Sequence, residues 1–171
     1  MRLLEVRLMS NVVKELKSII EKINPELCFR CNKCVSGCPV AKVVDEYRPN
    51  RIVRKAYLGL VDELINSELI WLCTQCFTCM ERCPMDVAPA DVIVALRNIA
   101  SKRGKTHEVW ARMASNILRL SAILPEMGVV TKDRKLVKRE ILGITVFKRT
   151  EKSVLKRIFE ESGFPLKIGE S

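Results

Sequence analysis

The sequence predicts a mainly helical fold that is organised around two cysteine runs. All eight cysteines of the 171-residue chain lie within residues 28–38 and 73–83, and each cysteine of the first run recurs 45 positions later. The segments between and around these runs repeat apolar residues every three or four positions, which is the period of an amphipathic helix. A helical frame that carries two copies of one cysteine pattern is therefore expected.

Composition limits the class of protein. A chain of this length with 48% hydrophobic residues suits one domain, or a small domain with extensions. The 30 Lys and Arg against 20 Asp and Glu give a net charge of +10. That charge is compatible with nucleic acid, an anionic membrane surface, an acidic protein partner or a solvated basic face. Charge alone does not choose among these partners.

The N-terminal residues lack the pattern of an export signal. Glu5 and Arg7 stand where a signal peptide needs an uninterrupted apolar stretch, and no run of 18 apolar residues occurs in the chain. We therefore expect a cytoplasmic location and no transmembrane segment. In a reducing compartment, a dense set of cysteines more often binds metal than forms disulfides. The cysteines are expected as thiolates on metal.

The first predicted helix covers residues 11–23, and Asn24-Pro25 ends it. Its polar face mixes both signs of charge and has no aromatic residue at its border. Packing on the core or on a partner is therefore favoured over a membrane surface. Its apolar face consists of Val12, Val13, Leu16, Ile19, Ile20 and Ile23.

The connection between the cysteine runs, residues 45–72, predicts helix rather than strand. Pro49 suits a first helical turn, and Asp62 is a candidate cap for a further short segment. The apolar residues that follow Pro49 at helical spacing are Ile52, Val53, Ala56, Tyr57 and Leu60.

A helix is also predicted over residues 89–104, with a proline near its start and Gly104 as its terminator. Its inward residues are Val92, Ile93, Leu96, Ile99 and Ala100. Residues 107–124 predict another amphipathic helix, ended by Pro125.

Beyond Gly128 the patterns weaken. We expect a short strand at residues 144–148 and a helix at residues 151–161. That last helix is expected to bury Val154, Leu155, Ile158 and Phe159. Because this third of the chain is basic and carries no recognisable chemistry, we interpret it as a docking extension.

The cysteine runs carry the chemistry. Three cysteines at intervals of two residues fold around one metal centre, whereas in the bacterial run C-x₂-C-x₂-C-x₃-C-P the fourth cysteine ligates the other cluster. Applied to this sequence, the rule predicts two [4Fe–4S] clusters. Cluster 1 is held by Cys28, Cys31, Cys34 and Cys83, and cluster 2 by Cys73, Cys76, Cys79 and Cys38.

The alternative is a pair of structural zinc sites in an interaction protein, because two CxxC units suffice for one Cys₄ zinc site. A pair of zinc sites does not explain the third spacing within each cysteine run, nor the proline that follows each run, Pro39 and Pro84. Iron–sulfur clusters therefore remain the favoured interpretation.

The paired motifs on a helical frame resemble the α-helical ferredoxins. More closely, Leu27-Cys-Phe-Arg-Cys-Asn-Lys-Cys, Trp71-Leu-Cys-Thr-Gln-Cys-Phe-Thr-Cys-Met-Glu-Arg-Cys-Pro and Ala90-Asp-Val-Ile-Val-Ala-Leu-Arg are similar to the C subunit of heterodisulfide reductase. On this resemblance the chain divides into an N-terminal amphipathic helix (1–24), a two-cluster α-helical ferredoxin domain (25–105) and a helical C-terminal docking extension (106–171).

The resemblance implies an electron-transfer subunit of an anaerobic, methanogenic type of complex. Such a subunit relays electrons between an A-like flavoprotein and a B-like catalytic subunit, which reduces the disulfide of coenzyme M and coenzyme B. The chain has no Cys-Cys-Gly and no GxGxxG, so we expect no catalytic residue and no substrate site of its own. An iron–sulfur subunit of the glycerol-3-phosphate dehydrogenase or fumarate reductase type is the alternative.

Two further features are set aside. His107, the one histidine, is interpreted as a surface residue at a helix start rather than as a cluster ligand, because eight cysteines already supply eight sites. The basic C-terminal region has no nucleic-acid-binding motif and little aromatic interleaving, so we expect no nucleic-acid partner.

Overall fold

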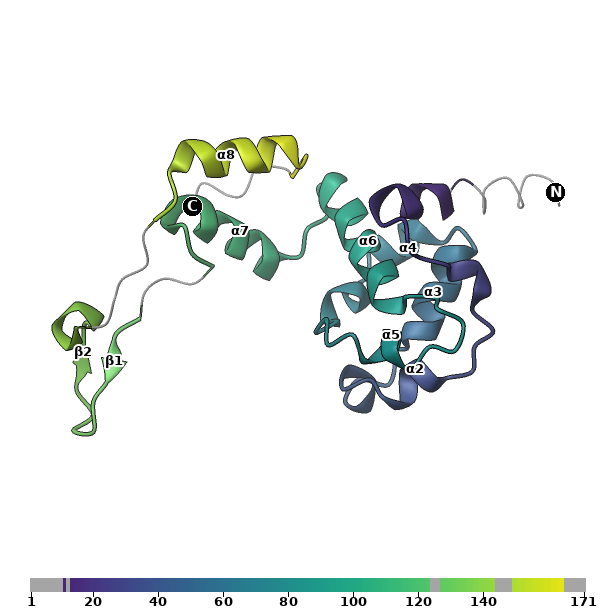
Figure 1. The fold of residues 1–171 in the computed structure, drawn as a ribbon, viewed down its shortest axis with the longest axis horizontal. Coiled ribbons are helices and arrows are strands. Elements are labelled where there is room, and N and C mark those ends of the chain that lie inside the picture. The colour runs from purple at the N-terminus through teal and green to yellow at the C-terminus, as the bar shows by residue number, and fades with distance from the viewer. Residues whose placement is uncertain (1–10, 12, 124–126, 144–148, 165–171) are drawn as a thin grey trace. The chain divides into compact units, whose positions relative to one another are not determined.

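Figure 1 shows the computed structural model of the chain, which describes residues 11, 13–123, 127–143 and 149–164. The chain divides into two compact units, Met1–Thr106 and His107–Ser171, and each unit is described by itself. Helices dominate both, so the prediction of a mainly helical fold is confirmed.

The first unit contains short helical elements and two longer helices. Residues 13–19 are helical, and the later elements are η1 (Pro25–Leu27), α2 (Lys33–Ser36), η2 (Val40–Lys42), α3 (Pro49–Tyr57), α4 (Val61–Ile65), η3 (Glu68–Leu72), α5 (Thr78–Glu81) and α6 (Pro89–Lys102). Helix α6 packs against α3 and α4, and α2 packs against α5 (Figure 1).

Helix α6 is the central element of this unit. Pro89 occupies its first position, where the fixed φ of proline suits a helix and the missing N–H costs nothing. Gly104 follows its end with φ of 70°, a left-handed conformation that glycine adopts without strain. All five residues predicted to face inward are at most 3% exposed, which confirms the predicted helix and its buried face.

The connection between the cysteine runs is helical, as predicted. Helix α3 begins at Pro49 and buries Ile52, Val53 and Ala56 in the same core as α6. Asp62 lies inside the first turn of α4 rather than at its cap, which is Leu60. Its carboxylate pairs instead with Arg103 at the end of α6, at 2.8 Å.

The N-terminal helix packs on this core through Leu16, and Ile23 beyond the helix is equally buried. Helical structure ends at residue 19, four residues earlier than predicted. The chain turns at residues 21–22, which brings Ile23 into the core and Asn24 to two tertiary hydrogen bonds. The Asn24 backbone N–H donates to the Val87 carbonyl at 3.3 Å, and the Asn24 side chain donates to the Asp86 carbonyl at 3.2 Å.

The second unit contains α7 (Glu108–Leu120), the antiparallel pair β1 (Val129–Val130) and β2 (Leu136–Val137), η4 (Arg139–Leu142) and α8 (Lys152–Glu161). Helix α7 packs against α8. His107 caps α7, where its Nδ1 accepts a hydrogen bond from the Val109 N–H at 3.2 Å. The strand pair was not predicted, because each strand has only two residues. The strand predicted at 144–148 lies outside the described residues.

The helix predicted near the C-terminus is confirmed as α8, but its expected burial is wrong, because Leu155 and Phe159 are only half-buried and the other two residues are exposed. Val154 and Ile158 are 45% and 55% exposed. The reason is that this unit forms little core: in the part of it that the structure describes, only Ala114 is buried.

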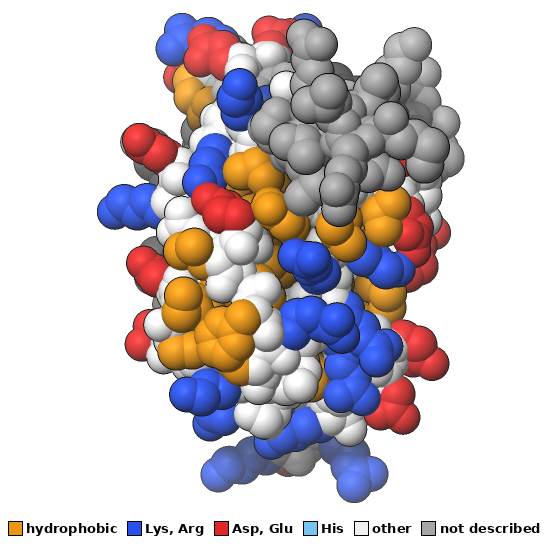
Figure 2. Space-filling model, turned by 90° about the vertical axis from the view of Figure 1, so that its right-hand side faces the viewer, with side chains coloured by type: hydrophobic (Ala, Val, Ile, Leu, Met, Phe, Trp, Pro, Cys, Tyr) orange, Lys and Arg blue, Asp and Glu red, His pale blue; other side chains and the backbone are white. Residues whose placement is uncertain are grey.

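Charge and apolar surface occur together on one face of the molecule. Figure 2 shows Lys and Arg side chains gathered beside hydrophobic side chains on that face, with several Asp and Glu side chains toward its edges. Across the described ranges, no helix combines the length and the apolar character needed to cross a membrane.

Leu96→Ala tests the central role of α6. Leu96 has no exposed surface, so truncation leaves a cavity and should lower the free energy of unfolding by about 2–5 kcal/mol. Urea unfolding followed by circular dichroism measures the change. Val130→Ala, at a side chain that is 64% exposed, is the control and should change stability by less than about 0.5 kcal/mol. Equal effects of the two substitutions would contradict this account of the core.

Candidate metal centres

The sequence repeat is also a backbone repeat. Helices α2 and α5 occupy equivalent positions after the second cysteine of each run. Left-handed residues precede both helices at the same places: Arg30 and Gln75 have φ of 62° and 52°, and Asn32 and Phe77 have φ of 64° and 58°. Such residues reverse the chain direction sharply. Each run is therefore wound into a tight loop whose cysteines border one space.

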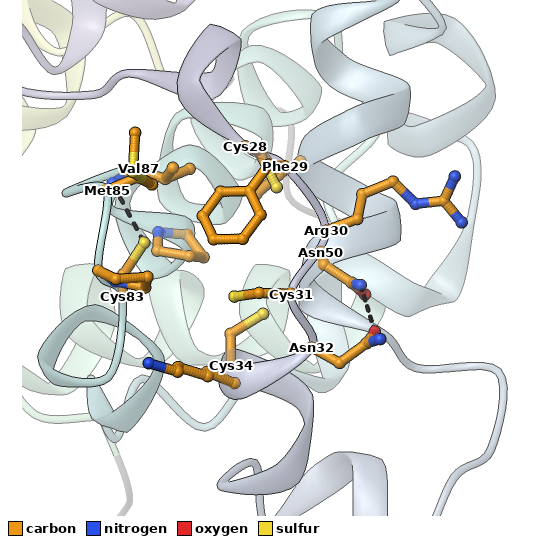
Figure 3. A pocket seen from close by; sticks show the side chains of 14 residues that line it. Cys28, Phe29, Arg30, Cys31, Asn32, Cys34, Asn50, Cys83, Met85 and Val87 are labelled. Atoms are coloured by element: carbon orange, nitrogen blue, oxygen red, sulfur yellow. Dashed lines mark hydrogen bonds between the residues drawn. The ribbon is translucent and has the colours of Figure 1, made fainter.

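The first cavity is lined by the first three cysteines of one run and by the last cysteine of the other. Its lining includes Cys28, Cys31, Cys34 and Cys83, and it encloses about 360 Å³, partly open to solvent. Figure 3 shows these four side chains around the cavity, with Cys83 on the opposite wall from the first run. Its apolar lining includes Val53, Met85 and Val87.

The second cavity has the reciprocal composition. Its lining includes Cys73, Cys76, Cys79 and Cys38, and its empty volume is about 300 Å³, part of which is open to solvent. Val40, Tyr47 and Phe77 also line it. The structure thus divides the eight predicted ligands into two groups of four.

Packing of α2 against α5 brings the runs together. The first turns of α3 and α6 contribute to both cavities: Pro49 lines the second and Asn50 the first, while Pro89 lines the first and Ala90 the second. A helix N-terminus favours negative charge, which suits a group ligated by thiolates.

Several side chains fix the loops locally. The Val87 N–H donates to the Cys83 sulfur at 3.4 Å, an interaction drawn in Figure 3. Asn50, which is 5% exposed, donates through Nδ2 to Oδ1 of Asn32 at 2.7 Å. This bond ties the left-handed residue of the first loop to helix α3.

The environments of the thiols favour a bound cation. Burial, with a further contribution from neighbouring thiolates, raises the pKa of Cys34 to about 11 and that of Cys79 to about 12. Hydrogen bonds from Thr78 lower the pKa of the exposed Cys76. Neighbouring thiolates repel one another and burial disfavours their charge, so these thiols ionise together only when a metal takes the place of their protons.

The aromatic and basic residues that flank the cysteines are exposed to solvent. Phe29 and Phe77 border the cavities, yet their side chains are 62% and 46% exposed. Arg30 and Lys33 are also exposed, and the Arg30 side chain points away from the sulfurs (Figure 3). The cavities therefore lie close to the surface of the unit.

Four sulfurs around each cavity fit an iron–sulfur cluster, because soft thiolates suit such clusters and each iron takes one cysteine. Within the described ranges, no group of three or more His, Cys, Asp or Glu side chains gathers in the manner of a site for a single metal ion. The sulfurs instead surround wider spaces.

Comparison with known proteins identifies the same region. Residues 25–87 match the 4Fe-4S dicluster domain family. The chain is 33% identical over 145 residues to the C subunit of the H₂:CoB-CoM heterodisulfide,ferredoxin reductase of Methanothermobacter thermautotrophicus, covering 84% of this chain and 78% of that protein. This chain belongs to the family of heterodisulfide reductase C subunits.

Two further members of the family are iron–sulfur C subunits of CoB–CoM heterodisulfide reductases. The protein of Methanopyrus kandleri is 34% identical over 127 residues, and the second such protein of Methanocaldococcus jannaschii is 36% identical over 124 residues. The alignments cover 74% and 72% of this chain, and the chain spans 66% and 61% of the length of those relatives. As a member of this family, the chain is an iron–sulfur protein of the [4Fe–4S] type.

For three polar residues near the cavities of this heterodisulfide reductase homologue, no role was predicted from the sequence. Tyr47 and Asn50 stand in the long connection, and Arg97 stands in α6. Arg97 left a detectable signal, because it follows Ile93 by four residues and precedes Ala100 by three, which places a charge on an apolar face. Tyr47 and Asn50 left none.

Asn32→Val tests the loop geometry. A β-branched residue at φ of 64° is strained, and Asn32→Gly loses the same bond to Asn50 without that strain. The valine variant should therefore be less stable than the glycine variant by about 1–2 kcal/mol. Urea unfolding of both iron-loaded chains measures the difference, and equal midpoints would contradict the left-handed assignment.

Proposed function

We propose that this chain is an electron-carrying subunit of a heterodisulfide reductase-like complex of the cytoplasm. It holds two [4Fe–4S] clusters and passes electrons between a flavin-containing partner and a disulfide-reducing partner. The observation that carries the proposal is the division of the eight cysteines between two cavities, with four in each.

Each cavity supplies one ligand set. Cluster 1 is held by Cys28, Cys31, Cys34 and Cys83, and cluster 2 by Cys38, Cys73, Cys76 and Cys79. A bound [4Fe–4S] cluster takes up and releases single electrons, with a potential set by its charge, hydrogen bonds and exposure. Because each set uses cysteines of both runs, the two sites share the α2–α5 contact, which favours a short distance between them.

Partner proteins need access to both sites. The exposed Cys31 and Cys76 bring each cavity close to the surface. Basic side chains beside apolar ones on the face in Figure 2 suit a partner that presents acidic and apolar groups. The names of the relatives supply the candidate complex and its substrate, the CoB–CoM heterodisulfide, whose reduction would take place on another protein of the complex.

The ligand assignment makes a prediction about pairs of substitutions. Cys83→Ala should remove the same paramagnetic signal as Cys31→Ala, and Cys38→Ala the same signal as Cys76→Ala. Iron should fall to about half of the roughly eight atoms per chain that two cubanes contain. Iron analysis and electron paramagnetic resonance of dithionite-reduced protein measure both quantities. If Cys83→Ala matches Cys76→Ala instead, each run holds its own cluster and the assignment is wrong.

The role in the complex makes a second prediction. A tagged full-length chain, purified without oxygen from its own cells, should bring down a flavoprotein together with a second cysteine-rich protein, both identified by mass spectrometry. Mixing the reduced chain with the oxidised partners should reoxidise its clusters. Recovery of glycerol-3-phosphate dehydrogenase or fumarate reductase components instead would assign the chain to a different oxidoreductase.

A further inference from the structure

Arg97 is a buried charge beside the second cavity. It lies on the inward face of α6 and is 6% exposed, and it is the one charged side chain that is buried among the described residues. Burying a guanidinium in an apolar core is unfavourable unless its hydrogen bonds are met and a negative group is near. Its surroundings therefore point to a specific role.

The hydrogen bonds of Arg97 converge on the segment that leads into the second cysteine run. Nε donates to the Ile70 carbonyl at 2.7 Å, and Nη2 donates to the carbonyls of Trp71 and Cys73 at 2.9 and 2.7 Å. The guanidinium also stands over the Trp71 ring, 5.6 Å from its centroid. Arg97 thus fixes the backbone that positions the Cys73 sulfur.

The charge of Arg97 also lies close to this ligand, because Nη2 bonds directly to the Cys73 carbonyl at 2.7 Å. Tyr47, which is 1% exposed, lines the second cavity together with Cys73. Cys73 therefore has a buried cation on its carbonyl and shares its cavity with a buried tyrosine.

The first cavity has no equivalent of Arg97 among the described residues. Counted from the cysteine runs, Arg97 corresponds to Ile52, and counted from the prolines that open α3 and α6 it corresponds to Tyr57. The cations that line the first cavity, Arg30 and Lys33, are exposed to solvent. Solvent screens an exposed charge far more than a buried one.

We propose that Arg97 is a positioning and tuning residue, which holds Cys73 and makes the cluster bound by Cys38, Cys73, Cys76 and Cys79 the more easily reduced of the two. This inference rests on the proposed function. Each added electron increases negative charge in the second cavity, and a fixed buried cation stabilises that charge. The electron therefore rests preferentially on the side of the second run.

The test is a redox titration of the full chain, with each cluster followed by electron paramagnetic resonance. The signal that Cys76→Ala removes identifies the second cluster. In the wild-type chain, that cluster should have the higher potential. Arg97→Gln should lower its reduction equilibrium constant at least tenfold, which is about 59 mV for a one-electron couple. Arg97→Lys, which keeps the charge, should lower it less.

Arg103→Gln is the matched control. Arg103 follows α6, is 40% exposed and pairs with Glu15 and Asp62 rather than with the cavity, so neither potential should move. If the glutamine and lysine variants shift the potential of the second cluster equally, or if neither shifts it, the tuning role is wrong. If Arg97→Gln does not retain iron, the test is the order of the two potentials in the wild-type chain. A lower potential for the second cluster than for the first overturns the inference. A wild-type chain with a single cluster would overturn the proposed function as well.

Discussion

The contact between α2 and α5 is the constraint on which the rest of the first unit depends. These two short helices cannot be stable alone, because four residues make barely one turn. They are held by the cysteine loops that precede them and by the core of α3, α4 and α6 behind them. In return, their contact sets Cys83 across from the first run and Cys38 across from the second. Neither cavity is complete within its own run, so both depend on the same contact.

The cost of this arrangement falls on the backbone. Arg30, Asn32, Gln75 and Phe77 all have positive φ, although none is glycine. Asparagine tolerates that region and is tied to Asn50, whereas Phe77 tolerates it poorly. Crowding and burial also hold Cys34 and Cys79 in the neutral thiol form, and a bound cation would offset the cost of ionising them.

The sequence predicted the parts that depend on short-range pattern. The helical frame, the buried face of α6 and its glycine terminator follow from period and capping. The grouping of the eight cysteines, four around each cavity, agrees with their repeated spacing. The early end of the first helix was not predicted, because the apolar period continues through Ile20 and Ile23 although the chain turns at residues 21–22. The exposure of Val154 and Ile158 escaped prediction because periodicity shows which residues share a face but not whether another element covers it. Asn50 and Tyr47 act only through partners distant in sequence, so no local signal marks them.

The repeat is most informative where it fails. The cysteines, the short helices α2 and α5 and the left-handed residues before them recur every 45 positions, but the residues around the two cavities do not. The residues 45 positions away from Arg97 and Tyr47 are Ile52 and Val92, both apolar and buried. If the two sets hold the clusters that we propose, these unequal surroundings would give them unequal affinity for an electron, because potential depends on charge and hydrogen bonding beyond the ligands. A symmetric pair would leave the electron without a preferred end, whereas this asymmetry would favour one end of the proposed pair.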